Sequence, residues 1–254
     1  MQRVFFGQTP ETPKTWRIDD WSSMNQAQRM GFLRSVSSNA GQDPRIATLC
    51  VQIFRSSGVQ PRDYKAQAQS LLTWVQKNIY YVNEPNERLQ DPMYTLNVGY
   101  GDCDDMALLL GAMCESVKLE YRYVLAGKCN GKIDRWIEGT PMKNGVWSHI
   151  YLIIGYPPFQ PKKWVYAEPT LASAKLGWDI VQAKNGSATM LPELASTDIE
   201  ETETSKDFIS KIKEGLHPST LIPTIIVAGI TSALVGEMAL YVRSKIKKIR
   251  KKNK

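Results

Sequence analysis

The hydrophobic period of the chain changes part-way along its 254 residues, and this change constrains the fold more than any other feature. Up to about residue 117, apolar residues recur at intervals of three and four, which is the period of an amphipathic helix. From residue 121 onward, short apolar runs rich in β-branched and aromatic residues alternate with Gly and Pro turns, as in strands. Helices followed by strands predict an α+β domain, and we place its end near residue 185. The predicted strands cover residues 121–125, 147–154 and 163–167 of one antiparallel sheet.

The helical part carries clear signals for where helices begin and end. Asp43 is an N-cap residue, and Pro44 takes the first helical position, where a missing N–H costs nothing. Gly58 stops the apolar pattern that follows. Residues 83–102 keep no period and contain two prolines and two glycines, which indicates a loop. The predicted helices cover residues 24–37, 44–57 and 62–80, and a fourth begins just after Asp102.

The chain after residue 185 divides into three segments of different composition. Residues 186–219 are rich in acids, Ser and Thr, so we expect a flexible acidic linker. Residues 220–242 are mostly apolar, and at about 1.5 Å per residue a helix of this length reaches the roughly 30 Å of a bilayer core. We therefore predict a single transmembrane helix. Pro223 and Glu237 dilute the segment and leave a buried or an interfacial amphipathic helix as the alternative.

The net charge of +7 is concentrated in a tail, residues 243–254, that holds eight Lys or Arg and no acid. Removing those eight charges from +7 leaves the rest of the chain at −1. A basic tail beside a membrane helix fits anionic lipid headgroups, at about 1 kcal/mol for each cation. The same cluster could neutralise the phosphates of a nucleic acid, which is the weaker expectation.

The membrane prediction leaves the orientation of the domain open. Positive residues stay on the cytoplasmic side, which would put the domain outside. Unpaired cysteines, and a first stretch without the apolar core of a secretory signal, instead fit a reducing compartment. A host membrane and the membrane of a virus particle are both compatible with this pattern.

The four cysteines form no Cys-x-x-Cys pair, which disfavours a zinc ribbon and a thioredoxin-type couple. Cys103 and Cys114 are eleven residues apart, or about 16 Å along a helix. They cannot share a zinc ion, whose bonds to sulfur are about 2.3 Å long. We expect no metal and no cofactor, and structural roles for Cys50, Cys114 and Cys129.

The junction Gly101-Asp102-Cys103-Asp104-Asp105 offers a candidate nucleophile. Asp102 is a natural N-cap, so Cys103 lies in the first turn of a helix, where the helix dipole favours an anion and lowers a thiol pKa. The three neighbouring acids act in the opposite sense, because they disfavour a thiolate. A buried structural cysteine is the alternative to a reactive one.

A thiol nucleophile needs a base, and the chain contains two histidines. His217 lies beside Pro218 at the end of the expected linker, so His149, in a predicted strand, is the better candidate. Its alternative role is that of a half-buried histidine in a sheet. A symmetric hairpin centred on residues 158–159 would set Glu168 directly opposite His149, where a carboxylate can orient the imidazole. A bulge would shift the pairing by one residue and move Glu168 to the other face.

Several motifs in order resemble the transglutaminase-like superfamily, particularly its prokaryotic and phage-borne members. They are Tyr80-Tyr81-Val82, Asp91-Pro92-Met93-Tyr94-Thr95-Leu96, Gly101-Asp102-Cys103-Asp104-Asp105, His149 and Trp164-Val165-Tyr166-Ala167-Glu168-Pro169-Thr170. The resemblance covers roughly residues 24–180 and implies a papain-like α+β fold with a Cys-His-Asp triad. Carried over by position, Cys103 is the nucleophile, His149 the general base and acid, and Glu168 the orienting carboxylate. Glu168 departs from the family, which usually has Asp there. The oxyanion hole would combine the Cys103 N–H with a side chain from upstream.

The resulting expectation is a membrane-anchored cysteine peptidase or amidase that acts through an acyl-enzyme on a peptide or protein, such as a peptidoglycan cross-bridge. The alternative is a catalytically idle domain of the same fold, used as a structural or binding protein in a membrane-containing phage particle. An anchor tethers a scaffold as readily as an enzyme.

Overall fold

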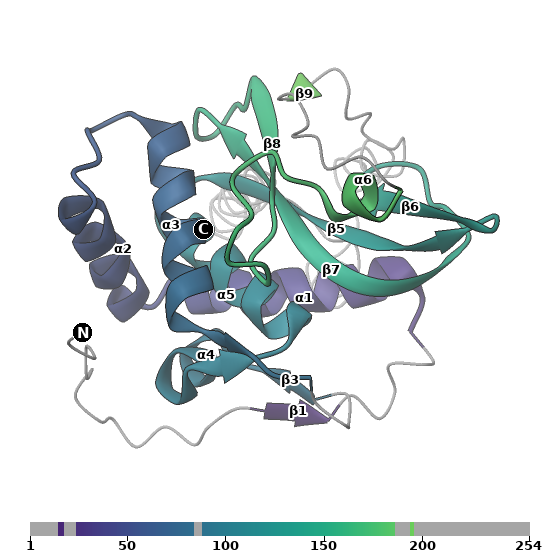
Figure 1. The fold of residues 1–254 in the computed structure, drawn as a ribbon. Helices are drawn as coiled ribbons and strands as arrows, with labels where there is room; N and C mark the ends of the chain where they lie inside the picture. The colour runs from purple at the N-terminus through teal and green to yellow at the C-terminus, as the bar shows by residue number, and fades with distance from the viewer. Residues whose placement is uncertain (1–14, 18–23, 84–87, 186–193, 196–254) are drawn as a thin grey trace, which may run out of the picture. The chain divides into compact units, whose positions relative to one another are not determined.

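The computed structural model describes residues 15–17, 24–83, 88–185 and 194–195 (Figure 1). The chain divides into two compact units, one made of residues 1–20 and 36–200 and the other of residues 21–35 and 201–254. The second unit is described only at residues 24–35, which begin a helix. Among the described residues, no helix is both long and apolar enough to cross a bilayer. The predicted membrane helix at 220–242 and the basic tail lie outside the described residues.

The described elements follow one another in the predicted sense, helices before the main sheet. Their bounds are β1 (Thr15–Arg17), α1 (Gln26–Gly41), α2 (Pro44–Ser56), α3 (Tyr64–Asn78), β2 (Tyr80–Tyr81), β3 (Arg88–Gln90), α4 (Pro92–Val98), β4 (Tyr100–Gly101), α5 (Cys103–Ser116), β5 (Glu120–Cys129), β6 (Lys132–Ile137), β7 (Gly145–Tyr156), β8 (Lys163–Ala167), α6 (Ile180–Lys184) and β9 (Leu194–Ala195). This order confirms the α+β class. The four predicted helices correspond to α1, α2, α3 and α5.

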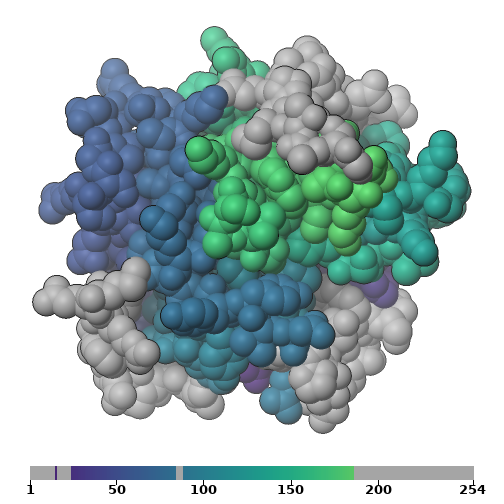
Figure 2. Space-filling model, in the orientation of Figure 1, coloured from purple at the N-terminus to yellow at the C-terminus, as the bar shows by residue number. Residues whose placement is uncertain are grey.

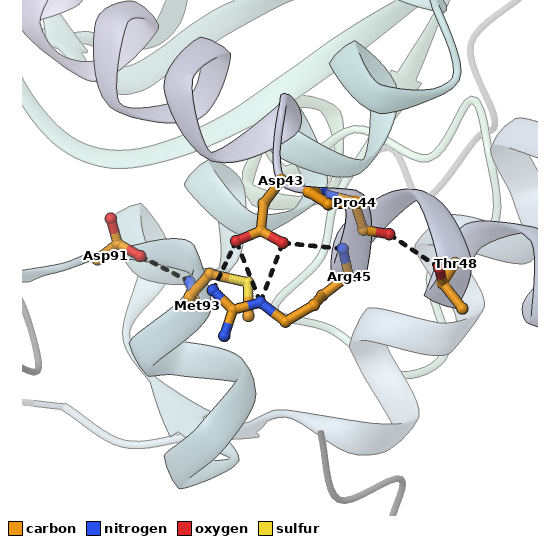
Figure 3. Close-up of polar contacts among 6 residues, drawn as sticks. All are labelled: Asp43, Pro44, Arg45, Thr48, Asp91 and Met93. Carbon is orange, nitrogen blue, oxygen red and sulfur yellow. Dashed lines mark hydrogen bonds and ion pairs between the residues drawn. The ribbon is translucent and has the colours of Figure 1, made fainter. Parts of the chain in front are cut away.

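Figure 3 shows how side-chain caps start two of the helices. The Asp43 carboxylate accepts a hydrogen bond from the Arg45 N–H at 2.8 Å and starts α2. The Asp91 carboxylate accepts from the Met93 N–H at 2.8 Å and starts α4. Each cap satisfies a backbone donor that has no partner inside the helix. The second cap lies in a segment that was predicted to be a loop.

The predicted loop at 83–102 contains short elements that period analysis does not detect. α4 has seven residues, too few to show a helical period, although its Asp-Pro start and its left-handed Gly99 are ordinary helix boundaries. β2 and β4 pair in parallel, with Tyr80 beside Tyr100 and Tyr81 beside Gly101. This pairing brings the end of α3 to the start of α5.

α5 is the central helix of the first unit. All of its residues from Asp105 to Glu115 are buried, and it packs against α2, α3, α4 and β7. A helix that is apolar on all sides needs such surroundings. Gly111 permits a close approach, because a Cβ there would lie 2.9 Å from the ring of Tyr121. The core therefore holds the helix that carries Cys103 firmly against the sheet.

The main sheet has the strand order β6-β5-β7-β8-β9, and all neighbours are antiparallel. The β7–β8 hairpin pairs Leu152 with Ala167 and Ile153 with Tyr166. This register differs by two residues from the symmetric hairpin predicted above. Because side chains alternate with a period of two, an even shift leaves every residue on its predicted face. β9 lies within the segment 186–219 that was predicted to be a linker.

Candidate active site

Cys103 takes the first position of α5, and a capping box fixes the backbone around it. The Asp102 carboxylate accepts from the Asp104 N–H at 3.2 Å, and the Asp105 carboxylate accepts from the Asp102 N–H at 3.3 Å. Asp105 is fully buried, and its other oxygen accepts from the Gln90 N–H at 2.7 Å. Asp102 thus has the N-cap role predicted from the sequence, and Asp105 completes a capping box that was not predicted.

Gly101 makes the capping box sterically feasible. A Cβ at this position would lie 2.6 Å from the Cβ of Asp105, closer than two carbon atoms can approach. Asp105 would have to move, and its two backbone partners would be lost. The Gly101-Asp102-Cys103 sequence thus has a structural reason that is independent of any reaction.

His149 and Glu168 form a close pair. The Nε2 atom of His149 lies 2.7 Å from the Oε2 atom of Glu168, which is fully buried. The other carboxylate oxygen accepts from the Thr170 N–H at 3.0 Å and from the Thr170 hydroxyl at 2.7 Å. A carboxylate only accepts, so the Nε2 atom carries the proton and the Nδ1 atom of a neutral imidazole is left as an acceptor. The pair therefore fixes the orientation of the His149 imidazole.

The register of the hairpin explains why a glutamate can make this contact. Extending the observed pairing by one residue beyond Leu152–Ala167 sets Glu168 opposite Tyr151, so that His149 is its diagonal neighbour. Diagonal Cβ atoms are about 7–8 Å apart, against about 5 Å for directly opposed ones. The additional methylene of Glu168 helps to span that longer separation.

Cys103 meets β7 beside His149. The backbone N–H of Ile150, the residue after His149, donates toward the Cys103 sulfur and lowers its pKa. α5 also packs on β7. The structure therefore brings the three predicted residues, Cys103, His149 and Glu168, to one place from α5, β7 and the end of β8.

The thiol of Cys103 has a raised pKa. Burial is the largest cause, Asp104 and then Asp102 add to it, and the pKa reaches about 12 in spite of the Ile150 N–H. Of the two opposing effects expected from the sequence, the neighbouring acids do raise the pKa, and burial raises it further. At neutral pH the resting site holds a protonated thiol.

Part of the chain that contains this site is similar to a known protein family. Residues 59–169 match the sequence profile of the transglutaminase-like superfamily, and the match includes Cys103, His149 and Glu168. Over these residues the chain is similar to the transglutaminase-like superfamily. A comparison with curated proteins gives no match.

Two solved structures show a distant similarity to this chain. One is a candidate cysteine protease from Cytophaga hutchinsonii, at 15% identity and a TM-score of 0.36, with 60% of this chain and 44% of that chain covered. The other is a candidate protease from Parabacteroides distasonis, at 10% identity and a TM-score of 0.33, with coverages of 57% and 31%. This chain spans less than half the length of either protein.

Tyr81 lies beside Cys103 in the candidate site. It pairs with Gly101, two residues before Cys103, and about half of its surface is exposed. Burial raises the pKa of its hydroxyl, and Cys103 is the next cause, ahead of the nearby acids. The hydroxyl therefore lies near the thiol and stays a hydrogen-bond donor. The sequence contained Tyr81 in a family motif, but no spacing rule gave it a role.

Gln76 on α3 holds the segment that follows Glu168. Its side-chain amide nitrogen lies 2.8 Å from the Glu168 carbonyl, 2.9 Å from that of Leu171 and 2.8 Å from that of Ala174. Two helical turns earlier on α3, the side-chain oxygen of Gln69 accepts a hydrogen bond from the Leu176 N–H at 3.0 Å. In Figure 2 this green segment lies against the blue surface of α3. Contacts between residues about 90 positions apart leave no periodic pattern in the sequence.

The remaining predicted residues have simpler surroundings. Cys50, Cys114 and Cys129 are buried and unbridged. Carboxylate oxygens of Asp102, Asp104 and Asp105 lie within 4.8 Å of one another, but two of these acids form the capping box. The absence of a metal and a cofactor stays a prediction. His217 lies outside the described residues.

Proposed function

We propose that this transglutaminase-like domain is a cysteine hydrolase that cleaves amide or peptide bonds through an acyl-enzyme. Cys103 is the nucleophile, His149 the general base and acid, and Glu168 the carboxylate that orients the imidazole. The proposal is supported mainly by the hydrogen bond of 2.7 Å between His149 and Glu168. The residue after His149, Ile150, donates its N–H to the Cys103 sulfur, so this pair lies beside the thiol.

The raised thiol pKa determines the order of events. Since Cys103 is protonated at rest, the Nδ1 atom of His149 takes the thiol proton as the sulfur attacks the carbonyl carbon. The C–N bond then breaks, and the imidazolium gives its proton to the leaving amine. Water attacks the thioester, again with His149 accepting a proton. The carboxylic acid leaves, and the thiol is restored.

Two donors support the negative oxygen of the tetrahedral intermediate in this proposal. The Cys103 N–H belongs to the first turn of α5, whose amides have no carbonyl partner within the helix. The Tyr81 hydroxyl is the second donor, because Tyr81 pairs with Gly101 just before Cys103 and a phenol is protonated at neutral pH. Tyr81→Phe should slow acyl transfer by about 10-fold or more, with no loss of fold.

A peptide library incubated with the full chain in H₂¹⁸O tests the proposed reaction. We expect new carboxyl groups that carry ¹⁸O, and none with Cys103→Ala. Added hydroxylamine separates hydrolysis from transfer, because an amine-accepting enzyme yields hydroxamates in preference to ¹⁸O-labelled acids. A folded wild-type chain that cleaves nothing would count against the hydrolase.

An idle domain that binds a partner is the second candidate, and the raised pKa of Cys103 favours it. Burial and two adjacent acids oppose the thiolate that a cysteine enzyme must form or approach. In that case, substitution of Cys103 by Ala would leave partner binding intact. The hydrolase would thus lose its function with Cys103→Ala, whereas the binding domain would keep its own.

Attachment to a bilayer is the second part of the proposal and concerns residues 220–254. The apolar length and the adjacent basic tail support it. The full chain should stay with membranes in alkaline carbonate, whereas a chain ending at residue 219 should be released. Release of both would contradict the anchor and leave the proposed chemistry untouched.

A further inference from the structure

The imidazole of His149 has a second neighbour besides Glu168. Tyr151 lies two residues along β7, on the same face of the strand. Its ring stacks on the imidazole, with centroids 5.7 Å apart and planes 22° apart. Offset stacks at this spacing are favourable and orient both rings. Glu168 thus holds the edge of His149, and Tyr151 holds its face.

Tyr151 is itself held in a fully buried position. Its hydroxyl donates to the Oδ1 atom of Asp179, which as a carboxylate can only accept. Burial, and then Asp179, raises the pKa of Tyr151 well above its ordinary value. The phenol therefore keeps the proton that ties it to Asp179.

A buried carboxylate needs compensation, and Arg135 provides it. The Nη1 atom of Arg135 lies 3.0 Å from the Oδ2 atom of Asp179, which also caps α6 by accepting from the Gln182 N–H at 3.1 Å. The guanidinium lies 5.1 Å from the centre of the Tyr166 ring, and Tyr166 packs on Tyr151 with centroids 6.1 Å apart. These contacts close a ring of four side chains, Tyr151, Asp179, Arg135 and Tyr166.

We infer that Tyr151, held by Asp179, is a positioning residue that keeps the Nε2 atom of His149 toward Glu168 and the Nδ1 atom toward the thiol. Its catalytic meaning rests on the proposed function. The stack fixes the plane of the imidazole, and in that plane the Nε2 atom meets the Oε2 atom of Glu168. Without the stack the ring can tilt out of this plane, which would weaken the hydrogen bond that keeps the proton on Nε2.

A purely structural role for the four side chains makes a different prediction. Such a cluster would stabilise the sheet, and its loss would lower stability without changing the protonated nitrogen of His149. The state of that nitrogen separates the two roles. It is read directly from the ¹⁵N chemical shifts of the imidazole, with no substrate present.

The test uses the ¹⁵N-labelled full chain, whose two histidines are assigned with His217→Ala. We expect the Nε2–H form of His149 to dominate in the wild type. Tyr151→Leu should raise the Nδ1–H fraction by about two- to tenfold, as expected for the loss of an aromatic pair, and Tyr151→Phe should raise it less. Tyr123→Phe is the matched control, because it removes another buried tyrosine hydroxyl, which bonds Ser37.

Unchanged His149 shifts in a folded Tyr151→Leu chain would overturn the inference. If that variant does not fold, the comparison of Tyr151→Phe with Tyr123→Phe decides in the same way. Equal shifts in these two variants would again overturn it. A separate measurement tests the proposed function: it would fail if Cys103 were acylated at the same rate in the wild type and in His149→Ala.

Discussion

The Nε2 atom of His149 contacts the Oε2 atom of Glu168 at 2.7 Å, although the hairpin register makes the two residues diagonal rather than opposed. A diagonal pair needs a longer side chain than an opposed pair does. The glutamate that departs from the family's usual aspartate is therefore matched to this register. The length of the side chain at this position should matter for function.

Shortening Glu168 tests that match. Glu168→Asp should slow acylation of Cys103 by about 10-fold or more, because the carboxylate would no longer reach the imidazole. Glu168→Gln should cost more, about 10²- to 10⁴-fold, since an amide that donates to Nε2 favours the wrong tautomer. Rates from mass spectrometry of an acetylated Cys103 check both values. Faster acylation with Asp would show that the register argument is wrong.

Gln76 should support Glu168 through the backbone. Gln76→Glu places a carboxylate among three carbonyl oxygens at 2.8–2.9 Å and should lower the free energy of unfolding by about 2–4 kcal/mol. Gln76→Lys supplies donors at the same place and should cost less. Urea unfolding measures both variants. Gln52→Glu, on the exposed surface of α2, is the control and should have little effect.

The capping box before Cys103 makes a separate prediction. Asp105→Asn turns an acceptor of the Asp102 N–H into a donor at a fully buried position. We expect a loss of about 1–3 kcal/mol in the free energy of unfolding. Asp134→Asn, which breaks a partly exposed pair with Lys143 at 2.9 Å, should cost less than about 1 kcal/mol. Equal costs would contradict a special role for the cap.

The raised thiol pKa values predict how stability changes in alkali. Burial raises the pKa of both Cys103 and Cys50 from 9.0 to about 12. The folded chain then binds more protons than the unfolded chain between these values, so each thiol's contribution is complete below pH 9 and is lost as the pH rises toward 12. The loss is at most about 1.4 kcal/mol per pH unit for each thiol.

Alanine variants isolate this contribution. Cys103→Ala and Cys50→Ala should each make the free energy of unfolding fall less steeply between pH 9 and 11 than in the wild type, whatever their cost at pH 7. Urea titrations at several pH values give the slopes. Parallel slopes in wild type and variants would mean that the thiols ionise as readily in the folded state.

The sequence was sufficient for the parts of the fold that depend on local pattern. The caps Asp43 and Asp102 and the change of period gave the main helices, three strands and the α+β class. α4 is too short to show a period, and the pairing of Tyr81 with Gly101 depends on contacts that no local rule encodes.

Two features of the candidate site could be predicted from the sequence: the position of Cys103 at the start of a helix, and the location of His149 and Glu168 on one face of the sheet. Side chains alternate between the two faces of a strand, so the error of two residues in the predicted register still left His149 and Glu168 on the same face. The balance between helix start and burial at Cys103 could not be settled in advance, because burial depends on the whole core. Gln76, Tyr151 and Asp179 support the site from distant segments and carry no motif of their own.

Acylation of Cys103 by p-nitrophenyl acetate at pH 7 tests the central claim most directly, with each cysteine of the full chain followed by mass spectrometry. Cys103 should be acetylated fastest, and His149→Ala should slow it by about 10²- to 10⁴-fold, the usual contribution of a general base. His217→Ala, the matched control, should leave the rate unchanged. A Cys103 that reacts equally in the wild type and in His149→Ala would contradict the account.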